Sequence, residues 1–313
     1  MGMVAFYTAE MMVQEADNHG FQRGLSVRLI YDWASLGLLD YPAQPGHGRG
    51  HKSQWSEEQL QLFLVLLEKR KDTKRITALY NIPVWLWLYW GDRYASLNQV
   101  RRALGNWGKA VLRTWGRATT GVWDDAEKAA RHFLDQLAYP QKKITGKRKL
   151  LRGLTELFYK GRVTQTDLVP IVQQILVASG KAATAGPAAY LFSAENVALQ
   201  IAAGYEAIRH LDEISNGTFE WARRFININN RGYAREQPQL AKDSELGHLF
   251  ARFDAEKSLN RACEDLAQAV GVTRLGLPEH IRDSLRDPNL WDTLQLNTEG
   301  ELVKTRSGLI VPT

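Results

Sequence analysis

The sequence predicts a mainly α-helical fold, and two observations support this. Apolar side chains recur at helical spacing through most of the 313 residues. Short segments containing glycine and proline separate these stretches and mark turns. Hydrophobic residues make up 44% of the chain and charged residues 24%, as is usual for a globular protein. At roughly 150 residues per domain, the length allows two or more cores.

Two short helices are expected first. Thr8 is the expected N-cap of the earlier one, because a threonine hydroxyl can accept a hydrogen bond from an unpaired amide of the first turn. Met11, Met12 and Ala16 are expected on its apolar side. Ser26 is expected to cap the later helix in the same way.

The later helix, expected over residues 26–36, has two distinct faces. The residues that recur at helical spacing and predict the buried face are Leu29, Ile30, Trp33 and Leu36. The residues that lie largely off that face are Arg28, Tyr31, Asp32 and Ser35. Gly37 suits a left-handed C-cap, after which Leu38 and Leu39 can fold back onto the core.

A glycine-rich basic loop follows this helix. Residues 45–52 have glycine at alternate positions and carry Arg49 and Lys52, so the loop can reverse tightly and reach phosphates or a minor groove. Trp55 is placed to fix the returning strand. Together these segments predict a winged helix-turn-helix that binds DNA, with residues 45–55 as its wing and the preceding helix as its recognition helix.

The next helix is expected from Ser56 to Arg70. Ser56 and Gln59 fit a capping box, in which the glutamine side chain bonds back to the cap. The cations at and beyond the end of this helix, which are candidates for contact with the DNA backbone, are Lys69, Arg70, Lys71, Lys74 and Arg75. Cations at a helix C-terminus are also favourable by about 0.3–1 kcal/mol each without any ligand, so the cluster has a structural explanation as well.

Residues 6–70 resemble the DNA-binding domain of MerR-type transcriptional regulators. The family pattern is Ser-Val-Arg-x-Ile-x-x-Tyr-x-x-x-Gly-Leu-Leu, then a Gly/Arg wing, an aromatic residue, and Ser-x-x-x-Leu at the start of a helix. The matching residues are Ser26, Val27, Arg28, Ile30, Trp33 (for tyrosine), Gly37, Leu38, Leu39, Arg49, Trp55, Ser56 and Leu60. The chain differs at Tyr31 and Asp32, where the family has arginine and tyrosine, and in a longer link before Ser26. The resemblance implies a winged helix-turn-helix fold, DNA binding, and a dimerisation helix soon after the winged helix.

Residues 82–90 form the most apolar stretch, Ile-Pro-Val-Trp-Leu-Trp-Leu-Tyr-Trp. Its aromatic residues are too dense for one helical face, so we expect a helix that is buried against the winged helix, or an interface. Stacking on nucleotide bases is the remaining alternative. A short helix is expected over residues 96–104, and Gly105, Gly108 and Gly116 interrupt the apolar pattern beyond it.

The rest of the chain is expected to be helical after a basic linker. Residues 124–137 predict an amphipathic helix, which is our candidate for the dimerisation helix. Residues 141–152 hold six basic side chains and no acidic one, with Gly146, and predict a linker that can also lie along DNA. Helical spacing then covers residues 150–159, 166–178, 193–214, 219–228 and 245–270, and the last fifteen residues predict a small hairpin or a loose tail.

Four parts of the chain follow from these patterns. They are a winged helix over residues 1–75, a Trp-rich helical extension packing on it over 76–140, the linker over 141–152, and a helical C-terminal domain for dimerisation or effector binding over 153–313.

Charge and cysteine content bound the environment and partners. The net charge is +6, with a basic front over residues 1–123 and a mildly acidic back over residues 153–313, which suits contact of the front with nucleic acid. The single cysteine, Cys263, excludes a disulfide framework and fits a reducing cytoplasm. The N-terminus has no signal-peptide pattern, and no stretch approaches about 18 uninterrupted apolar residues. We therefore expect a cytoplasmic protein without a membrane contact.

We expect no enzyme, cofactor or metal. Glu245 and His248 match one half of a carboxylate-bridged metal motif that requires two copies. Glu206 and His210 share a helix face, where side-chain ion pairs are the simpler explanation. Cys263 has no adjacent histidine, so no catalytic residue is predicted.

These patterns favour a sequence-specific DNA-binding transcriptional regulator, in which Arg28, Tyr31 and Asp32 address the major groove. One short reading helix covers few base pairs, so a homodimer on a two-fold DNA site is expected. The C-terminal helices would then dimerise or bind a small-molecule effector or a protein partner. An architectural or excisionase-like DNA-binding protein is one alternative. A protein-interaction module whose winged helix does not bind DNA is another, and Tyr31 and Asp32 favour it.

Overall fold

The structure, a computed structural model, is mainly helical, and this part of the fold prediction is confirmed. It describes residues 6–21, 24–43, 53–73, 75–118, 123–137, 146–159, 164–178, 193–242, 255–276, 283, 302–304 and 310–312. The helices of the first half are α1 (Ala9–Asn18), α2 (Val27–Leu36), α3 (Glu57–Asp72), α4 (Ile76–Leu79), α5 (Asn81–Trp90), η1 (Gly91–Arg93), α6 (Leu97–Ala118) and α7 (Trp123–Leu137). The second half contributes α8 (Lys147–Tyr159), α9 (Gln165–Ala178), α11 (Ala194–Arg209), η3 (Leu211–Glu213), α12 (Asn216–Leu240) and α13 (Ala255–Leu275).

Two small antiparallel sheets complete the described chain. Strand β1 (Phe6–Tyr7) pairs with β2 (Trp55–Ser56), and an isolated bridge joins Ala43 to Gln54. Strand β3 (Leu302–Lys304) pairs with β4 (Ile310–Pro312), which confirms the hairpin among the last fifteen residues. Within the described residues, no helix combines the length and the apolar character needed to cross a membrane.

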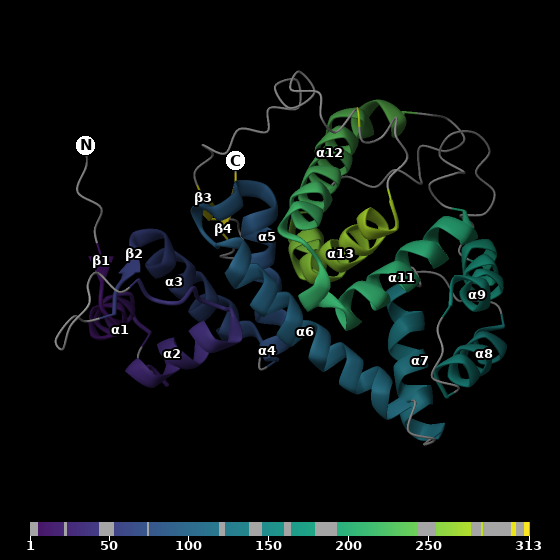
Figure 1. Ribbon diagram of the computed structural model, residues 1–313, viewed down its shortest axis with the longest axis horizontal. Helices are drawn as coiled ribbons and strands as arrows, with labels where there is room; N and C mark the ends of the chain where they lie inside the picture. The colour runs from purple at the N-terminus through teal and green to yellow at the C-terminus, as the bar shows by residue number, and fades with distance from the viewer. Residues whose placement is uncertain are drawn as a thin grey trace.

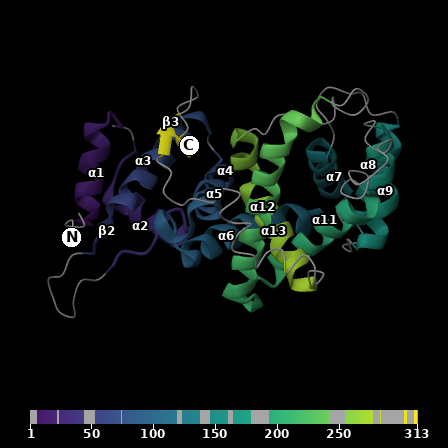
Figure 2. The same cartoon turned by 90° about the horizontal axis from the view of Figure 1, so that it is seen from above.

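The helices are arranged along one long axis (Figure 1). Helices α1, α2 and α3 lie at one end and α8 and α9 at the other, with α5, α6, α12 and α13 between them. The view from above shows the same order (Figure 2).

Two clusters of buried side chains hold this arrangement together. The larger cluster extends from Ala9 to Val270 and so joins α1–α6 to the helices of the C-terminal half. The smaller extends from Ala126 to Ile201 and joins α7, α8, α9 and the start of α11. The larger cluster crosses the boundary expected at residue 75, between the winged helix and the Trp-rich extension. The smaller crosses the boundary expected at residue 140, before the linker.

The Trp-rich stretch is the buried helix α5, as predicted, but its main partner is different. It packs chiefly on α13, and also on α6 and α12. Asn81 fixes the pairing, because its side chain donates to the Asn260 carbonyl and accepts from the Cys263 amide, at 3.1 and 2.9 Å. A hydrophobic pattern shows that a helix is buried and carries no information about its neighbour.

Helix α6 corrects the expectation of a short helix ended by glycines. It continues from Leu97 to Ala118 through all three. A Cβ at Gly108 would overlap the Ile208 side chain of α11, so glycine is needed here for close helix packing and not for a turn.

The expected linker is corrected over residues 147–152, which form the first turns of α8, whereas residues 141–145 lie outside the described residues. Leu150, Leu154 and Phe158 are buried on one side of α8, and this apolar face outweighs the cations around it. Helix α7 packs on α8 and α6, with Ala126 and the residues one and two turns later buried. Ala126, Ala130 and Leu134, on the apolar face proposed for dimerisation, are therefore covered within the chain.

Candidate nucleic-acid interface

The expected recognition helix is α2, and its sequence determines both of its ends. The Ser26 Oγ accepts from the Leu29 amide at 3.1 Å and caps the first turn. Gly37 ends the helix with φ of 78°, the left-handed conformation that favours glycine. Both caps are as predicted. The ten residues between them make a helix about 15 Å long at ~1.5 Å per residue.

One face of α2 is buried as predicted. Ile30 and Trp33 are buried, and the Trp33 ring meets Phe63 of α3 edge-on at 5.5 Å between centroids. Leu38 and Leu39 fold back onto the core beyond the C-cap and are fully buried. This packing fixes the rotation of α2 about its own axis and therefore determines which side chains point outward.

The outward face of α2 carries Arg28, Tyr31, Asp32 and Ser35, all of them exposed. The Arg28 side chain is 89% exposed, and its Nε lies 3.7 Å from the Asp32 Oδ2 one turn later. Such an exposed pair adds little stability, about 0.3–0.5 kcal/mol, but it restricts the arginine's direction. The Tyr31 ring stands edge-on against the buried Trp55 at 5.5 Å, which anchors one side of the face.

The end of α2 is held against α6. A Cβ at Gly37 would overlap the Ala103 backbone nitrogen, so the backbones at the end of α2 and in α6 are in close contact. The Asn106 Nδ2 donates to the Leu36 carbonyl at 3.0 Å, and the Gln99 Nε2 donates to the Leu38 carbonyl at 2.9 Å. The first bond satisfies a carbonyl that the end of a helix leaves unpaired, and the second satisfies a carbonyl just beyond the C-cap.

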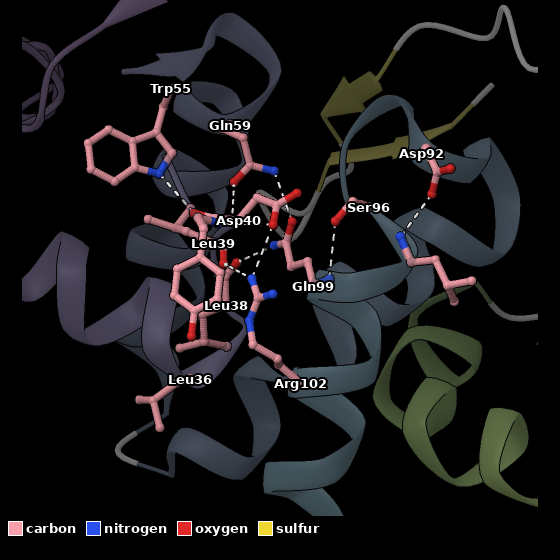
Figure 3. A network of polar contacts seen from close by, with 12 residues as sticks. Leu36, Leu38, Leu39, Asp40, Trp55, Gln59, Asp92, Ser96, Gln99 and Arg102 are labelled. Atoms are coloured by element: carbon pink, nitrogen blue, oxygen red, sulfur yellow. Dashed lines mark hydrogen bonds and ion pairs between the residues drawn. The ribbon is translucent and has the colours of Figure 1, made fainter. Parts of the chain in front are cut away.

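A buried polar network extends this attachment to the start of α3 (Figure 3). The Gln59 Nε2 donates to the Gln99 Oε1 at 3.0 Å and to the Tyr94 carbonyl, while the Asp40 amide donates to the Gln59 Oε1 at 2.7 Å. The Arg102 guanidinium pairs with Asp40 at 3.1 Å. The predicted capping box is therefore half right. Ser56 accepts from the Gln59 amide, but the Gln59 side chain serves the network and not the cap.

On its other side, α6 is bound to the C-terminal half. The Arg101 guanidinium donates to the Ile214 carbonyl at 2.7 Å and to the Leu211 carbonyl at 3.0 Å, and it lies over the Phe219 ring. Helix α6 thus holds α2 on one side and the region around η3 on the other. The sequence pattern assigns no role to Arg101 or Arg102.

The basic end of α3 lies next to α2. The Arg70 guanidinium lies 5.8 Å from the Trp33 ring centroid, and the Lys71 Nζ lies 4.4 Å from the Phe21 ring and 2.8 Å from Glu68. Lys69 is half-buried and Arg75 is exposed beyond the helix. The structure therefore brings two of the five predicted cations into contact with α2 or with the segment that leads into it.

The remaining predicted contacts lie outside the described residues. They are Arg49 and Lys52 of the expected wing and Lys74 after α3. Ala43, just before the expected wing, and Gln54, near its end, exchange two backbone hydrogen bonds of 2.8 and 3.1 Å. The two ends of that segment are thus adjacent to each other. Trp55, whose Nε1 donates to the Asp40 carbonyl, places them beside Tyr31.

The other groups considered for chemistry have structural partners. The His210 Nδ1 lies at hydrogen-bond distance from the Glu213 Oε1, 3.0 Å, and its Nε2 lies 3.7 Å from the Glu206 Oε2 on the same surface. Burial raises the pKa of the Cys263 thiol well above its ordinary value, so it is held as a neutral thiol. Within the described ranges no group of three or more histidine, cysteine or acidic residues could hold a metal ion. Glu245 and His248 lie outside those ranges.

Comparisons with models of protein families, with curated proteins and with solved structures find no match to this chain. The case for a function therefore depends on the geometry of the chain itself.

Proposed function

We propose that this chain is a sequence-specific DNA-binding transcriptional regulator that reads the major groove with α2. The observation that carries the proposal is the outward face of α2. Arg28, Tyr31 and Asp32 project from a helix that is capped at both ends and fixed against α3 and α6. A rigid helix with long polar side chains on its free face is the element that enters a major groove about 12 Å wide.

The side chains of this face suit base recognition. Arg28 is in the first turn of α2, where recognition helices place the residues that contact base edges. Arginine is the commonest reader of guanine O6 and N7. Asp32, 3.7 Å from Arg28, either keeps the guanidinium directed at its base or accepts from a cytosine amine.

The surrounding cations suit contact with the DNA backbone. The cations at the end of α3 are Lys69, Arg70 and Lys71 in its last turn and Lys74 and Arg75 after it, and Arg49 and Lys52 belong to the wing of this proposal. Because Arg70 and Lys71 lie against Trp33 and Phe21, phosphates bound there would flank α2 directly. Phosphate contacts set the orientation of a protein on the duplex, and base contacts supply its specificity.

A short helix reads few base pairs, so the proposal includes a homodimer on a two-fold DNA site. The C-terminal helices would carry the dimer contact or bind a small-molecule effector or protein partner. Since α7 is covered by α6 and α8, the dimer contact is proposed on another element.

A second candidate is a protein-interaction module that does not bind DNA. The Arg28–Asp32 pair favours it, because a neutralised arginine attracts phosphates less strongly than a free one. The two candidates separate at low salt, where a DNA-binding protein of this charge binds duplex of any sequence.

The proposal is tested by Arg28→Ala, with Arg209→Ala as the matched control. Both arginines are exposed and pair with an acidic residue of their own helix, but Arg209 is on α11. If Arg28 reads a base, its loss should cost about 1–3 kcal/mol on the selected site and clearly less on random duplex. The control should bind as the natural chain does. Equal loss on both duplexes would make Arg28 a phosphate contact and contradict base reading.

A further inference from the structure

A second cationic surface lies on α8, far from α2. Its members are Arg148, Lys149 and Arg152, all exposed, with Lys147 exposed at the helix start. Figures 1 and 2 show α8 at the opposite end of the long axis from α2. This surface is therefore separate from the face of α2 and from the cations at the end of α3.

These three cations lie on one side of α8. At about 100° per residue, they span roughly 100° of the helix surface, opposite the side that carries Leu150, Leu154 and Phe158. Those three apolar residues are buried, so the packing of α8 on its neighbours directs the cations into solvent. Arg152 pairs with Glu156 at 3.3 Å, whereas Arg148 and Lys149 form no ion pair with any described residue.

The position of Arg148 and Lys149, in the first turn, is unfavourable for α8 itself. The N-terminus of a helix is the positive end of its dipole, so a cation in the first turn costs about 0.3–1 kcal/mol, and α8 has no acidic residue there. Lys69, Arg70 and Lys71 instead lie in the last turn of α3, at a helix C-terminus, where the same dipole stabilises them. Helix stability thus explains the α3 cluster and does not explain the α8 cluster, which points to an anionic ligand.

We propose that Arg148, Lys149 and Arg152 form a second binding surface for the phosphate backbone of duplex DNA. The proposal rests on the proposed function, because charge complementarity selects a polyanion and DNA is the polyanion proposed for α2. Three guanidinium and ammonium groups on one exposed helix face suit successive phosphates and read no base. One duplex that runs along the long axis of the molecule would contact both α2 and α8. If the duplex bound by α2 runs in another direction, α8 would bind a second segment of duplex.

The test compares a triple variant with a matched one in the full chain. Arg148, Lys149 and Arg152 are replaced by glutamine in the first. Three exposed cations on or just after α11 and α12, Arg209, Arg224 and Lys242, are replaced by glutamine in the second. Binding to a random-sequence duplex is measured by fluorescence anisotropy at several salt concentrations. At about 0.9 per phosphate contact, the first variant should lower the slope of log affinity against log salt by about 2–3, and the second by less than about 1.

Acetylation of lysines by a small reagent gives a positional readout in the natural chain. Bound duplex should protect Lys149 several-fold and leave Lys242 unchanged, and circular dichroism should show the same helix content in all variants. Failure of the natural chain to bind duplex at low salt would overturn the proposed function. Normal binding with an unchanged slope in the first variant, or protection of Lys149 only by vesicles of anionic lipid, would overturn this inference alone.

Discussion

Replacing Gly37 by alanine should destabilise the protein far more than the same change at Gly24. Both glycines have positive φ, 78° and 74°, so each alanine pays the cost of a left-handed backbone, about 1–2 kcal/mol. Nothing lies within 4 Å of a Cβ at Gly24. At Gly37 the new Cβ would overlap the Ala103 nitrogen and lie 2.8 Å from the Gln99 carbonyl oxygen, and both are backbone atoms of α6.

Backbone atoms in a helix cannot move aside as a flexible side chain can, so α2 must shift away from α6. Overpacking of this kind costs about 1–3 kcal/mol beyond the backbone strain. We therefore expect Gly37→Ala to lower the free energy of unfolding by about 2–5 kcal/mol and Gly24→Ala by about 1–2 kcal/mol. Urea titration followed by circular dichroism and by tryptophan fluorescence measures both. Equal losses for the two variants would refute the close attachment of α2 to α6.

Three further changes test the packing and the charge of the interior. Gln99→Leu removes the bond to the Leu38 carbonyl and one of the two bonds donated by the Gln59 Nε2, so it should cost about 2–4 kcal/mol in urea titrations. Gln61→Leu, at an exposed site of α3, should cost almost nothing, and similar values for both variants would contradict the network. Burial raises the pKa of Asp265 to about 7 against the opposing charge of Arg261, so the unfolded chain ionises first and stability should fall as pH rises from about 4 to 7. Because the Asp265 side chain is 32% exposed, screening by solvent reduces this loss of stability to about 1–2 kcal/mol. Asp265→Asn should remove the loss above pH 7 and change the free energy of unfolding little at pH 4. An equal effect of the variant at both pH values would contradict the raised pKa of Asp265. Gly271→Ala should lower the thermal midpoint of unfolding, because its Cβ would overlap the α11 backbone. Gly153→Ala should raise the midpoint slightly, because a Cβ has space at this position of α8. The reverse order would refute the close α11–α13 crossing.

Local signals predicted the ends and faces of α2. A serine hydroxyl at a helix start and a glycine at its end act within a few residues, so Ser26 and Gly37 could be assigned from sequence. Helical spacing separated the buried Trp33 from the exposed Arg28 and Asp32 in the same way. The same reasoning failed at Met11, which was expected on the apolar side of its helix and is 47% exposed.

Contacts distant in sequence could not be predicted. Gly108 resembles a helix breaker until Ile208 of α11 is placed against it. Gln59 has the spacing of a capping box, but its side chain is used by Asp40, Tyr94 and Gln99, which only the folded chain brings near. The role of Gln99 in holding α2 has no sequence signal, because a single buried glutamine in a helix has no distinctive pattern.

The base contacts, the DNA partner and the dimer remain predictions. They are consistent with an exposed and firmly held α2, and the structure adds the attachment to α6 that such a role requires. Arg101 binds α6 to the C-terminal half. An effector or partner bound to that half would therefore act on α2 through α6.

The most direct test of the account is selection of bound sequences from a pool of random duplex DNA by the full-length chain, repeated at several salt concentrations. The account predicts an enriched motif with two-fold symmetry and a few fixed base pairs in each half, because one short helix reads each half-site. Arg28→Ala should relax the preference at one position of each half. Absence of binding to any duplex at low salt would contradict the account.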